Sequence, residues 1–354
     1  MKLLKHSLKA RILFLLASCA ALLISTPLNG VYAQKSKNET QSEMRWEHSD
    51  NGLRRRMEVR GKAEFNDDYT DVIGVSEGGW VIIEEQRDSQ SYRYEVRRDA
   101  AGNLTRAFFV NGTARSLDET TRAWLAKIVL DAIRQGAFDV EKRVQRILSK
   151  SGVAGVLAEI EQISGDYAKR RYYQELIKQA NLNAAGLRDV LRQVARDISS
   201  DYEQAQLLIA VAPMLTGKDA AIQPFFDAVA TIKSDYEHSR VLKTLVKDGT
   251  PNSAVLVLVA SSTKSISSNY ERRGVLTAVA RTKNQSEEVL RLLLDSAAEF
   301  SSDYEKATFL IEVSNVYVGD TRLRAAFLKA VETIKSDYER GRVLSTLLKN
   351  KQIS

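Results

Sequence analysis

The sequence is poor in the residues that build disulfide frameworks and histidine-based metal sites. Its 354 residues include one cysteine, Cys19, and three histidines, His6, His48 and His238. A lone cysteine excludes a disulfide scaffold, and so few histidines exclude a histidine-rich zinc site. Only four prolines occur, while hydrophobic residues make up 44% of the chain. This composition excludes collagen-like and disordered proteins.

Several signatures of catalysis and cofactor binding are also missing. The sequence contains no HExxH, no GxxxxGK[ST] and no GxGxxG, the patterns of zinc peptidases, P-loop proteins and dinucleotide-binding folds. We therefore predict no catalytic, metal-binding or cofactor-binding residue. One enzymatic alternative stays open, a hydrolase with a pair of carboxylates, because the fold alone sets the separation of such a pair.

Residues 1–33 have the order of a secretory signal peptide. Four bases precede an apolar run at 12–24, and a small-x-small cleavage pattern ends at Ala33. Spanning the hydrocarbon core of a membrane needs roughly 17–25 residues, so an uncleaved anchor is the weaker interpretation. We expect cleavage after Ala33 and export of the mature protein to the periplasm or the medium of a bacterial cell.

A second processing route competes with this cleavage. Residues 16–19 read LASC and resemble the lipobox of bacterial lipoproteins, in which Cys19 would carry the lipid. The residues at 20–24 stay apolar, whereas a mature lipoprotein normally turns polar at once. Lipidation of Cys19 is therefore the alternative to cleavage at Ala33. After cleavage we expect no integral membrane span.

The charge balance argues against nucleic acid as a partner. The formal net charge is +7, from 52 bases and 45 acids, and the predicted signal peptide holds four of the bases. Removing it leaves 48 bases against 45 acids, a net charge of +3. So small an excess produces no field strong enough for DNA or an anionic membrane.

A small antiparallel β domain is predicted at 44–116, after a flexible polar linker at 34–43. Alternating segments with the pattern of strands lie at 54–60, 72–75, 80–86, 92–98 and 104–110. Tight hairpins are indicated by Gly78 and by Asn111-Gly112, which tolerate a positive φ. The apolar face of this β-meander is expected to lie on the helices that follow and to cap them.

The rest of the chain, 117–354, is a repeat array. The segments ISGDYA, ISSDYE, IKSDYE, ISSNYE, FSSDYE and IKSDYE recur at intervals of 35, 34, 34, 34 and 34 residues. Apolar residues recur at helical spacing before and after each segment, which predicts a helix, a short turn and a second helix. Six such hairpins predict an α-solenoid. A seventh, degenerate hairpin is expected upstream, with helices near 118–134 and 139–149.

The repeated segment itself explains the turn. Its serine can cap the second helix, and a glutamate three residues later can bond back to the serine, which is a capping box. The serines expected as caps are Ser200, Ser234, Ser268, Ser302 and Ser336. The first repeat has glycine and alanine at these two positions and lacks the box.

Two regular rows of side chains follow from the period. The first holds Tyr167, Tyr202, Tyr236, Tyr270, Tyr304 and Tyr338, beside the acids Asp166, Asp201, Asp235, Asp303 and Asp337 and Asn269. These residues can line a groove for an extended partner. The interpretation we favour from spacing is structural: each ring packs between neighbouring hairpins, and each acid completes a helix cap.

The second row lies three residues after the acids and carries positive charge. It consists of Lys169, His238, Arg272, Lys306 and Arg340. Such a stripe is a tentative partner face for an acidic protein or peptide. The alternative is an ordinary solvated helix face whose bases pair with nearby glutamates.

A family resemblance adds to this interpretation. The segments EGGWVIIEE, YEVRRDAAGNLTRAFFVNG and TRAWLAKIVLDAIRQGAFDVEKRVQRIL, with the iterated I-x-S-D-Y-E, resemble an extracytoplasmic SDYE-repeat region of bacterial envelope proteins. The region is similar to the one that trails some antibiotic-sensing antirepressor-type membrane metallopeptidases. The resemblance covers about 54–354. It implies a helical-repeat region without proteolytic activity, since this sequence has neither the membrane helices nor the zinc-binding helix of those peptidases.

The sequence as a whole predicts a mainly α protein with a small β domain. Curved repeat surfaces commonly bind other molecules, so the expected function is non-catalytic recognition of a protein or peptide, or scaffolding, in the cell envelope. The envelope hydrolase and a purely structural spacer are the alternatives.

Overall fold

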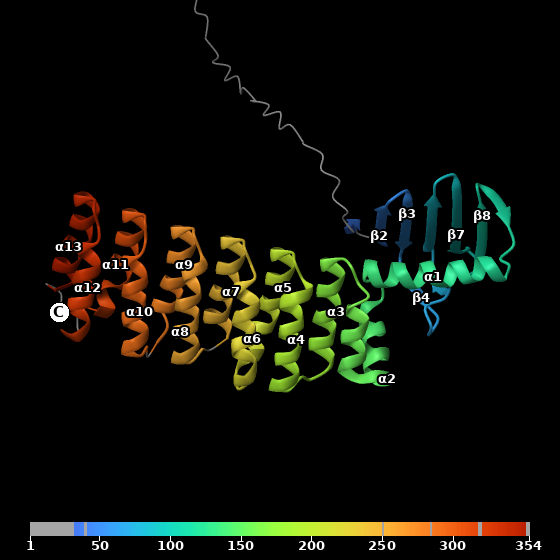
Figure 1. Ribbon diagram of the computed structural model, residues 1–354. Coiled ribbons are helices and arrows are strands. Elements are labelled where there is room, and N and C mark those ends of the chain that lie inside the picture. Colours follow the sequence, from blue (N-terminus) through green and yellow to red (C-terminus); the bar gives the residue numbers. More distant parts are fainter. Residues whose placement is uncertain (1–31, 39–40, 250, 284, 318–320, 352–354) are drawn as a thin grey trace, which may run out of the picture.

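The computed structural model describes residues 32–38, 41–249, 251–283, 285–317 and 321–351. The chain forms an elongated molecule with a β-sheet at one end and a row of paired helices extending from it (Figure 1). Most of the predicted signal peptide, including Cys19, lies outside the described residues. Within the described part of the chain, no helix is both long and apolar enough to cross a membrane.

Seven antiparallel strands form the main sheet, in the order β1-β2-β3-β6-β7-β8-β9, and β4 pairs with β5 in a small second sheet. The strands are β1 (Tyr32–Asn38), β2 (Gln41–Asp50), β3 (Leu53–Arg60), β4 (Ala63–Phe65), β5 (Val72–Val75), β6 (Trp80–Arg87), β7 (Gln90–Arg98), β8 (Leu104–Val110) and β9 (Thr113–Arg115). The predicted antiparallel meander is thus confirmed.

The five predicted strands correspond to β3, β5, β6, β7 and β8, whose ends differ from prediction by at most two residues. The flexible linker expected at 34–43 is wrong, since β1 and β2 cover most of it and pair with each other. The segment is polar and has no apolar periodicity, but an antiparallel pair is held by main-chain hydrogen bonds, which need none. Polar residues are also common on edge strands.

One face of the sheet is buried by the first helix, α1 (Glu119–Gly136). Trp46, Met57 and Tyr94 from the strands are fully buried in one core with Ile128 and Ile133 of the helix. Figure 1 shows α1 running across the strands. The apolar side of the meander therefore lies on a helix, as the sequence predicts, and the opposite side of the sheet is charged.

The remaining helices build the repeat array. They are α2 (Val140–Ile160), α3 (Asp166–Gln179), α4 (Ala184–Asp197), α5 (Asp201–Val211), α6 (Asp219–Ala230), α7 (Asp235–Asp248), α8 (Ser253–Ser262), α9 (Asn269–Ala280), α10 (Glu287–Ala298), α11 (Asp303–Tyr317), α12 (Thr321–Glu332) and α13 (Asp337–Lys351). Each repeated segment ends one helix and starts the next, as the 34-residue period predicts.

The helices form two layers along the array. The helices that follow the repeated segment, α3, α5, α7, α9, α11 and α13, pack side by side in one layer, and α4, α6, α8, α10 and α12 pack side by side in the other. A single apolar core runs between the layers, and its members extend from Ala137 to Val343. Each repeat adds one helix to each layer, which is the arrangement of a helical-repeat protein.

The two helices of the predicted seventh hairpin are present, but they do not close into a hairpin. The apolar face of α1 belongs to the core of the sheet, while α2 packs on α3. Gly152 interrupts α2 with φ 63° and ψ −163°, a backbone conformation that essentially only glycine adopts. The part of α2 after Gly152 then serves as the first helix of the first repeat.

Candidate functional site

Each repeat turn starts its second helix with a serine cap. The hydroxyl oxygens of Ser200, Ser234, Ser268, Ser302 and Ser336 accept hydrogen bonds from the amides of Glu203, Glu237, Glu271, Glu305 and Glu339, at 3.3–3.4 Å. A side-chain oxygen at this position satisfies one of the backbone donors that a helix start leaves without a partner. The turns therefore have the geometry that the serine spacing predicts.

Four acids of the repeated segments tie their own repeat to the next one. Asp201 accepts hydrogen bonds from two consecutive amides of the following turn, Lys233 N at 3.1 Å and Ser234 N at 2.7 Å. The same bonds join Asp166 to 199–200, Asp235 to 267–268 and Asp303 to 335–336. We call this series the amide ladder. It holds the turn edge of the array together through charge-assisted hydrogen bonds.

The predicted bond from the glutamate of the capping box back to the serine is wrong. The amides of four capping serines are bound by the acid of the preceding repeat, and the glutamates of the box bind bases instead; the four are Ser200, Ser234, Ser268 and Ser336. Glu271, for example, accepts hydrogen bonds from the hydroxyl of Ser239 and from Lys243 Nζ. Burial opposes ionisation of Glu271, but these two donors outweigh it and hold its pKa below the ordinary value.

Asn269 is the weakest member of the amide ladder. Its Oδ1 accepts from Ser301 N at 3.2 Å, and its Nδ2 donates to Ser301 Oγ. Asn269→Asp should raise the free energy of unfolding by about 1 kcal/mol at pH 7, because hydrogen bonds to a charged acceptor are stronger by about that amount. Urea denaturation followed by far-UV circular dichroism measures this gain.

The pH dependence of that gain has a definite sign. Backbone amides of Ser336 and Lys335 hold the pKa of Asp303 below its ordinary value, and an aspartate at 269 enters the same setting. The added stability is then present above the unfolded pKa, about 3.9, and is lost as the pH falls through the folded pKa. Asn183→Asp, at the cap of α4, is the matched control. An unchanged midpoint for Asn269→Asp at pH 7 would contradict the ladder.

The basic stripe predicted as a partner face is wrong. His238, Arg272 and Lys306 are only 2%, 8% and 4% exposed, and Lys169 and Arg340 are half-buried. Position three after the acid lies on the first turn of its helix and faces the next repeat. There, Lys169 Nζ donates to Asp197 O at 2.8 Å and Lys306 Nζ to Thr333 O at 3.2 Å. Cations at these helix ends are stabilised by the helix dipole.

Burial also disfavours the charged form of His238. Its Nε2 lies 2.9 Å from Ser262 Oγ, and burial lowers the pKa of the ring below its ordinary value. Arg272 pairs with Glu299 at 2.6 Å. These side chains join neighbouring repeats inside the array.

The tyrosines, in contrast, lie on the surface. The rings of Tyr202, Tyr236, Tyr270, Tyr304 and Tyr338 are 54%, 58%, 61%, 57% and 75% exposed; Tyr167, in the first repeat, is half-buried. The interpretation favoured from spacing, in which every ring packs between hairpins, is wrong for these five. A tyrosine at the second position of a helix points away from the interior, because the next two positions face the neighbouring repeat. We call the five rings the tyrosine row.

Arginines hold several of these rings in position. The guanidinium of Arg240 lies over the ring of Tyr236 at 5.7 Å, that of Arg273 over Tyr270 at 5.5 Å, and that of Arg342 over Tyr304 at 5.6 Å. Each such contact contributes about 0.5–1 kcal/mol at an exposed site. These three rings are therefore exposed but not free to turn at random, and they offer flat apolar surfaces at a 34-residue interval.

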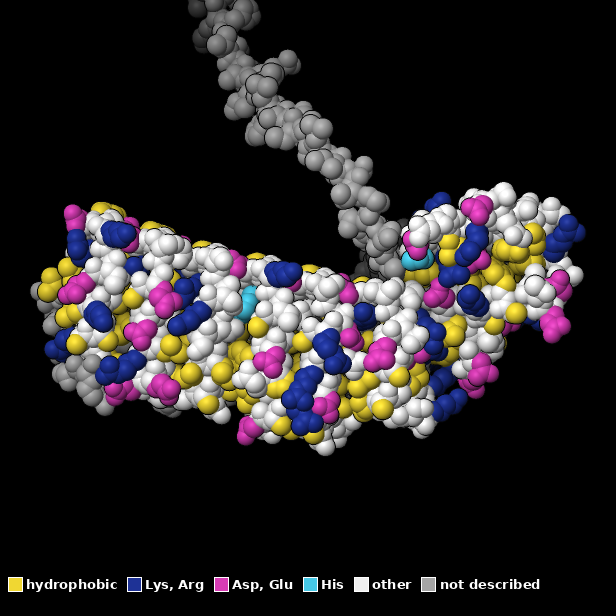
Figure 2. Space-filling view, in the orientation of Figure 1, with side chains coloured by type: hydrophobic (Ala, Val, Ile, Leu, Met, Phe, Trp, Pro, Cys, Tyr) yellow, Lys and Arg dark blue, Asp and Glu magenta, His cyan; other side chains and the backbone are white. Residues whose placement is uncertain are grey.

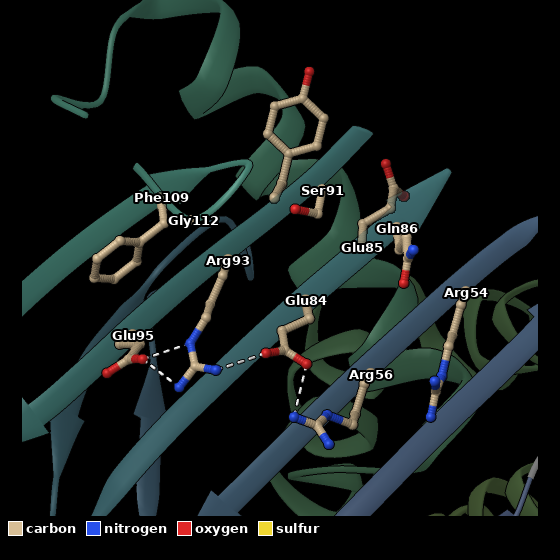
Figure 3. A pocket seen from close by; sticks show the side chains of 11 residues that line it. Arg54, Arg56, Glu84, Glu85, Gln86, Ser91, Arg93, Glu95, Phe109 and Gly112 are labelled. Carbon is tan, nitrogen blue, oxygen red and sulfur yellow. Dashed lines mark hydrogen bonds and ion pairs between the residues drawn. The ribbon is translucent and has the colours of Figure 1, made fainter. Parts of the chain in front are cut away.

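The outer face of the sheet contains a shallow depression of about 470 Å³. Figure 3 shows its floor, where Arg56 binds Glu84 and Arg93 bridges Glu84 and Glu95. Opposite charges on neighbouring strands stabilise a sheet in this way. Because these charges already bind one another, the depression is a weaker candidate for binding than the tyrosine row.

One motif escaped the sequence analysis. Residues 74–78 match GxSxG, the pattern of the hydrolase nucleophile elbow. That elbow is a turn from a strand into a helix, whereas Ser76 lies in the turn between β5 and β6, and its Oγ accepts a hydrogen bond from Lys62 N at 3.0 Å. Among the described residues, no group of three or more acids, histidines or cysteines could hold a metal ion.

The surface charge offers no competing site on the face that Figure 2 shows. Lysines, arginines and acids are scattered over it with both signs side by side. Comparisons of the chain with protein-family models, with curated proteins and with solved structures found no match in any of the three. The tyrosine row is the strongest candidate site, because its rings are exposed and regularly spaced.

Proposed function

We propose that this protein is a non-catalytic recognition module of the bacterial cell envelope, and that the tyrosine row binds an extended peptide or protein segment. The observation that carries the proposal is the exposure of five tyrosine rings, each more than half accessible, at one 34-residue interval. Tyrosine is enriched where proteins bind each other, since its ring buries a large area and its hydroxyl stays hydrated.

The amide ladder supports this function because it fixes the spacing of the rings. Tyr202, Tyr236 and Tyr304 each directly follow an aspartate that accepts two amides of the next turn. Tyr270 follows Asn269, which accepts one. A binding surface whose parts are already in place loses little conformational entropy when the partner arrives. The row is therefore suited to additive contacts, one from each repeat.

The spacing also suits an extended polypeptide. Helices that pack side by side have axes about 8–10 Å apart, so successive rings are separated by about one such distance. A polyproline II segment advances about 9.3 Å in each turn of three residues. Every third side chain of such a segment would meet one ring, which is how aromatic-lined surfaces recognise proline-rich peptides.

The proposal is tested by removing the rings while keeping the fold. The first variant changes Tyr202, Tyr236, Tyr270, Tyr304 and Tyr338 to serine, and its matched control changes the same five residues to phenylalanine. We expect the mature protein to retain a partner from envelope extract, and each lost ring to weaken binding about tenfold, equivalent to about 1.4 kcal/mol. The phenylalanine variant should retain most of the binding.

Two outcomes would contradict the proposal. Equal retention of the partner by the serine variant would show that another surface binds it. Reproducible absence of any partner would favour the structural spacer. Circular dichroism of both variants checks that the helices are intact, which is expected because the five rings contribute little to the core.

A further inference from the structure

At the last position of the amide ladder, the acid binds no amide of a following turn among the described residues. Asp337 occupies the ladder position in α13, at the end of the molecule opposite the sheet (Figure 1). Its side chain is 92% exposed and pairs with Arg340 of the same helix. Within the described residues, no backbone amide of another turn donates to it. The group that joins each earlier repeat to its neighbour is here turned to solvent.

Apolar side chains on the same end are uncovered as well. Leu328, Leu344 and Leu348 of α12 and α13 are 41%, 40% and 66% exposed. One repeat earlier, the same three positions hold Leu294, Leu310 and Ser314, and none of these is more than 1% exposed. The outer face of α12 and α13 thus has the apolar character of a surface that, elsewhere in the array, another hairpin covers.

The cation of this repeat is also without its usual acceptor. Lys306, one repeat earlier, donates to the carbonyl of Thr333 at the end of α12. Arg340 holds the same position and instead binds Asp337. The two groups that each join a repeat to its neighbour therefore bind one another here. An exposed pair of this kind costs little to separate.

The opposite end of the array is closed. Ser164, in the turn of the first repeat, donates its amide to Gln135 Oε1 at 2.9 Å, and Gln135 Nε2 donates to Gln162 O at 3.0 Å. Gln135 belongs to α1, so the helix beneath the sheet supplies the acceptor that a preceding repeat would supply. The sheet and α1 cap this end, as terminal elements of solenoids commonly do.

We propose that the outer face of α12 and α13 docks a helical hairpin of another protein. The hairpin would present two adjacent turn amides to Asp337, a helix C-terminus to Arg340 and apolar side chains to the leucines. The contact would continue the interface that already joins α10 and α11 to α12 and α13. It does not involve the function proposed for the tyrosine row.

A second copy of this chain fits the surface poorly. In a head-to-tail contact, the turn amide of Ser164 and the neighbouring carbonyl are already bound by Gln135. In a tail-to-tail contact, two faces of the same kind would meet, with carboxylates and cations but no turn amides for Asp337. The complementary face is one that has free turn amides and a free helix C-terminus.

The probe for this surface is a synthetic peptide of residues 321–351, the hairpin that covers the equivalent face of α10 and α11. We expect the fluorescein-labelled peptide to bind the purified protein saturably, as measured by anisotropy. The double variant Leu344→Lys and Leu348→Lys should weaken binding at least tenfold, and Asp337→Asn should weaken it severalfold. Ile73→Lys, which changes an equally exposed apolar residue on β5, is the matched control and should bind normally.

A second measurement covers the case in which the peptide alone stays unfolded. The same 31 residues are joined to the end of the chain by a flexible linker, which raises their effective concentration to about the millimolar range. The added hairpin should then raise the helical signal and the midpoint of thermal unfolding, and the lysine variant should abolish both gains. Failure in both formats would overturn the proposal. So would a dimer of the unmodified protein in light scattering that Leu348→Lys abolishes.

Discussion

Replacing Glu159 with alanine is expected to lower the free energy of unfolding by about 3–5 kcal/mol, the usual cost of removing one partner from a buried ion pair. Glu159 is 9% exposed and binds two arginines, Arg134 at 2.7 Å and Arg143 at 2.6 Å. These side chains come from α1, from the first part of α2 and from the part of α2 beyond Gly152. The variant would leave two cations without their carboxylate at the joint between the sheet and the array.

The three tryptophans make this effect easy to locate. Trp46, Trp80 and Trp124 all belong to the sheet and α1, so tryptophan fluorescence reports unfolding of that part, while far-UV circular dichroism reports the helices. Both midpoints in urea should fall for Glu159→Ala. Glu141→Ala, which removes an exposed carboxylate from the same helix, is the control and should shift them little. Equal effects of the two substitutions would show that the buried ion pairs do not stabilise the joint.

The same cluster gives an acid dependence with a clear direction. Burial opposes ionisation of Glu159, but Arg134 and Arg143 outweigh it and hold its pKa below the ordinary value. Its contribution to stability is therefore fully present above the unfolded pKa, about 4.3, and is lost as the pH falls through the folded pKa. The difference in stability between the native protein and Glu159→Ala should shrink over that interval.

Tyr69→Ala is expected to cost about 3–5 kcal/mol, the range for removing a large aromatic side chain from a core. Tyr69 is 2% exposed in the loop between β4 and β5. The guanidinium groups of Arg143 and Arg146 lie 4.7 Å and 5.2 Å from its ring centre, and its hydroxyl lies 3.4 Å from Asp139 Oδ2. Burial, with the charge of Asp139, raises the pKa of Tyr69 to about 12, so the phenol is neutral under ordinary conditions.

The expected signature of Tyr69→Ala is a separation of two transitions. Because the ring joins the small sheet to α2, its loss should lower the fluorescence midpoint more than the circular dichroism midpoint. Tyr69→Phe keeps the ring and loses only the hydroxyl contact, so its cost should be about 1 kcal/mol. Coincident transitions in the alanine variant would mean that other contacts couple the sheet to the array.

The repeats were predictable because their signals are local. The serine at the start of each second helix and the 34-residue interval follow from capping and from helical periodicity, and five strands follow from alternation. The linker that became β1 and β2 was not predictable in this way, since its pairing depends on backbone hydrogen bonds to another strand. The sequence did predict that a following helix covers the sheet. It did not predict that α1 does so instead of closing a hairpin with α2, because the apolar face of a helix does not indicate which neighbour buries it.

The candidate site shows the same limit at the level of single residues. Position three after the acid and the tyrosine two positions before it are only two residues apart, yet one faces the next repeat and the other faces solvent. Spacing alone assigns both to the same helix and cannot fix the rotation of that helix in the layer. His238 and Tyr236 illustrate the result: the predicted contact residue is 2% exposed, and the predicted packing residue is 58% exposed.

The amide ladder has a mechanical consequence. A long stack of hairpins bends by opening the joints on one side, and the bonds from Asp201 to Lys233 and Ser234 tie one side at its joint, as the equivalent bonds do at others. Flexing would therefore be taken up on the opposite side, while the tied edge keeps its length. The aromatic rings follow the acids along this tied edge, so their spacing should stay constant. On the function that we propose for the tyrosine row, a ligand would then be selected by whether its own repeat matches that spacing.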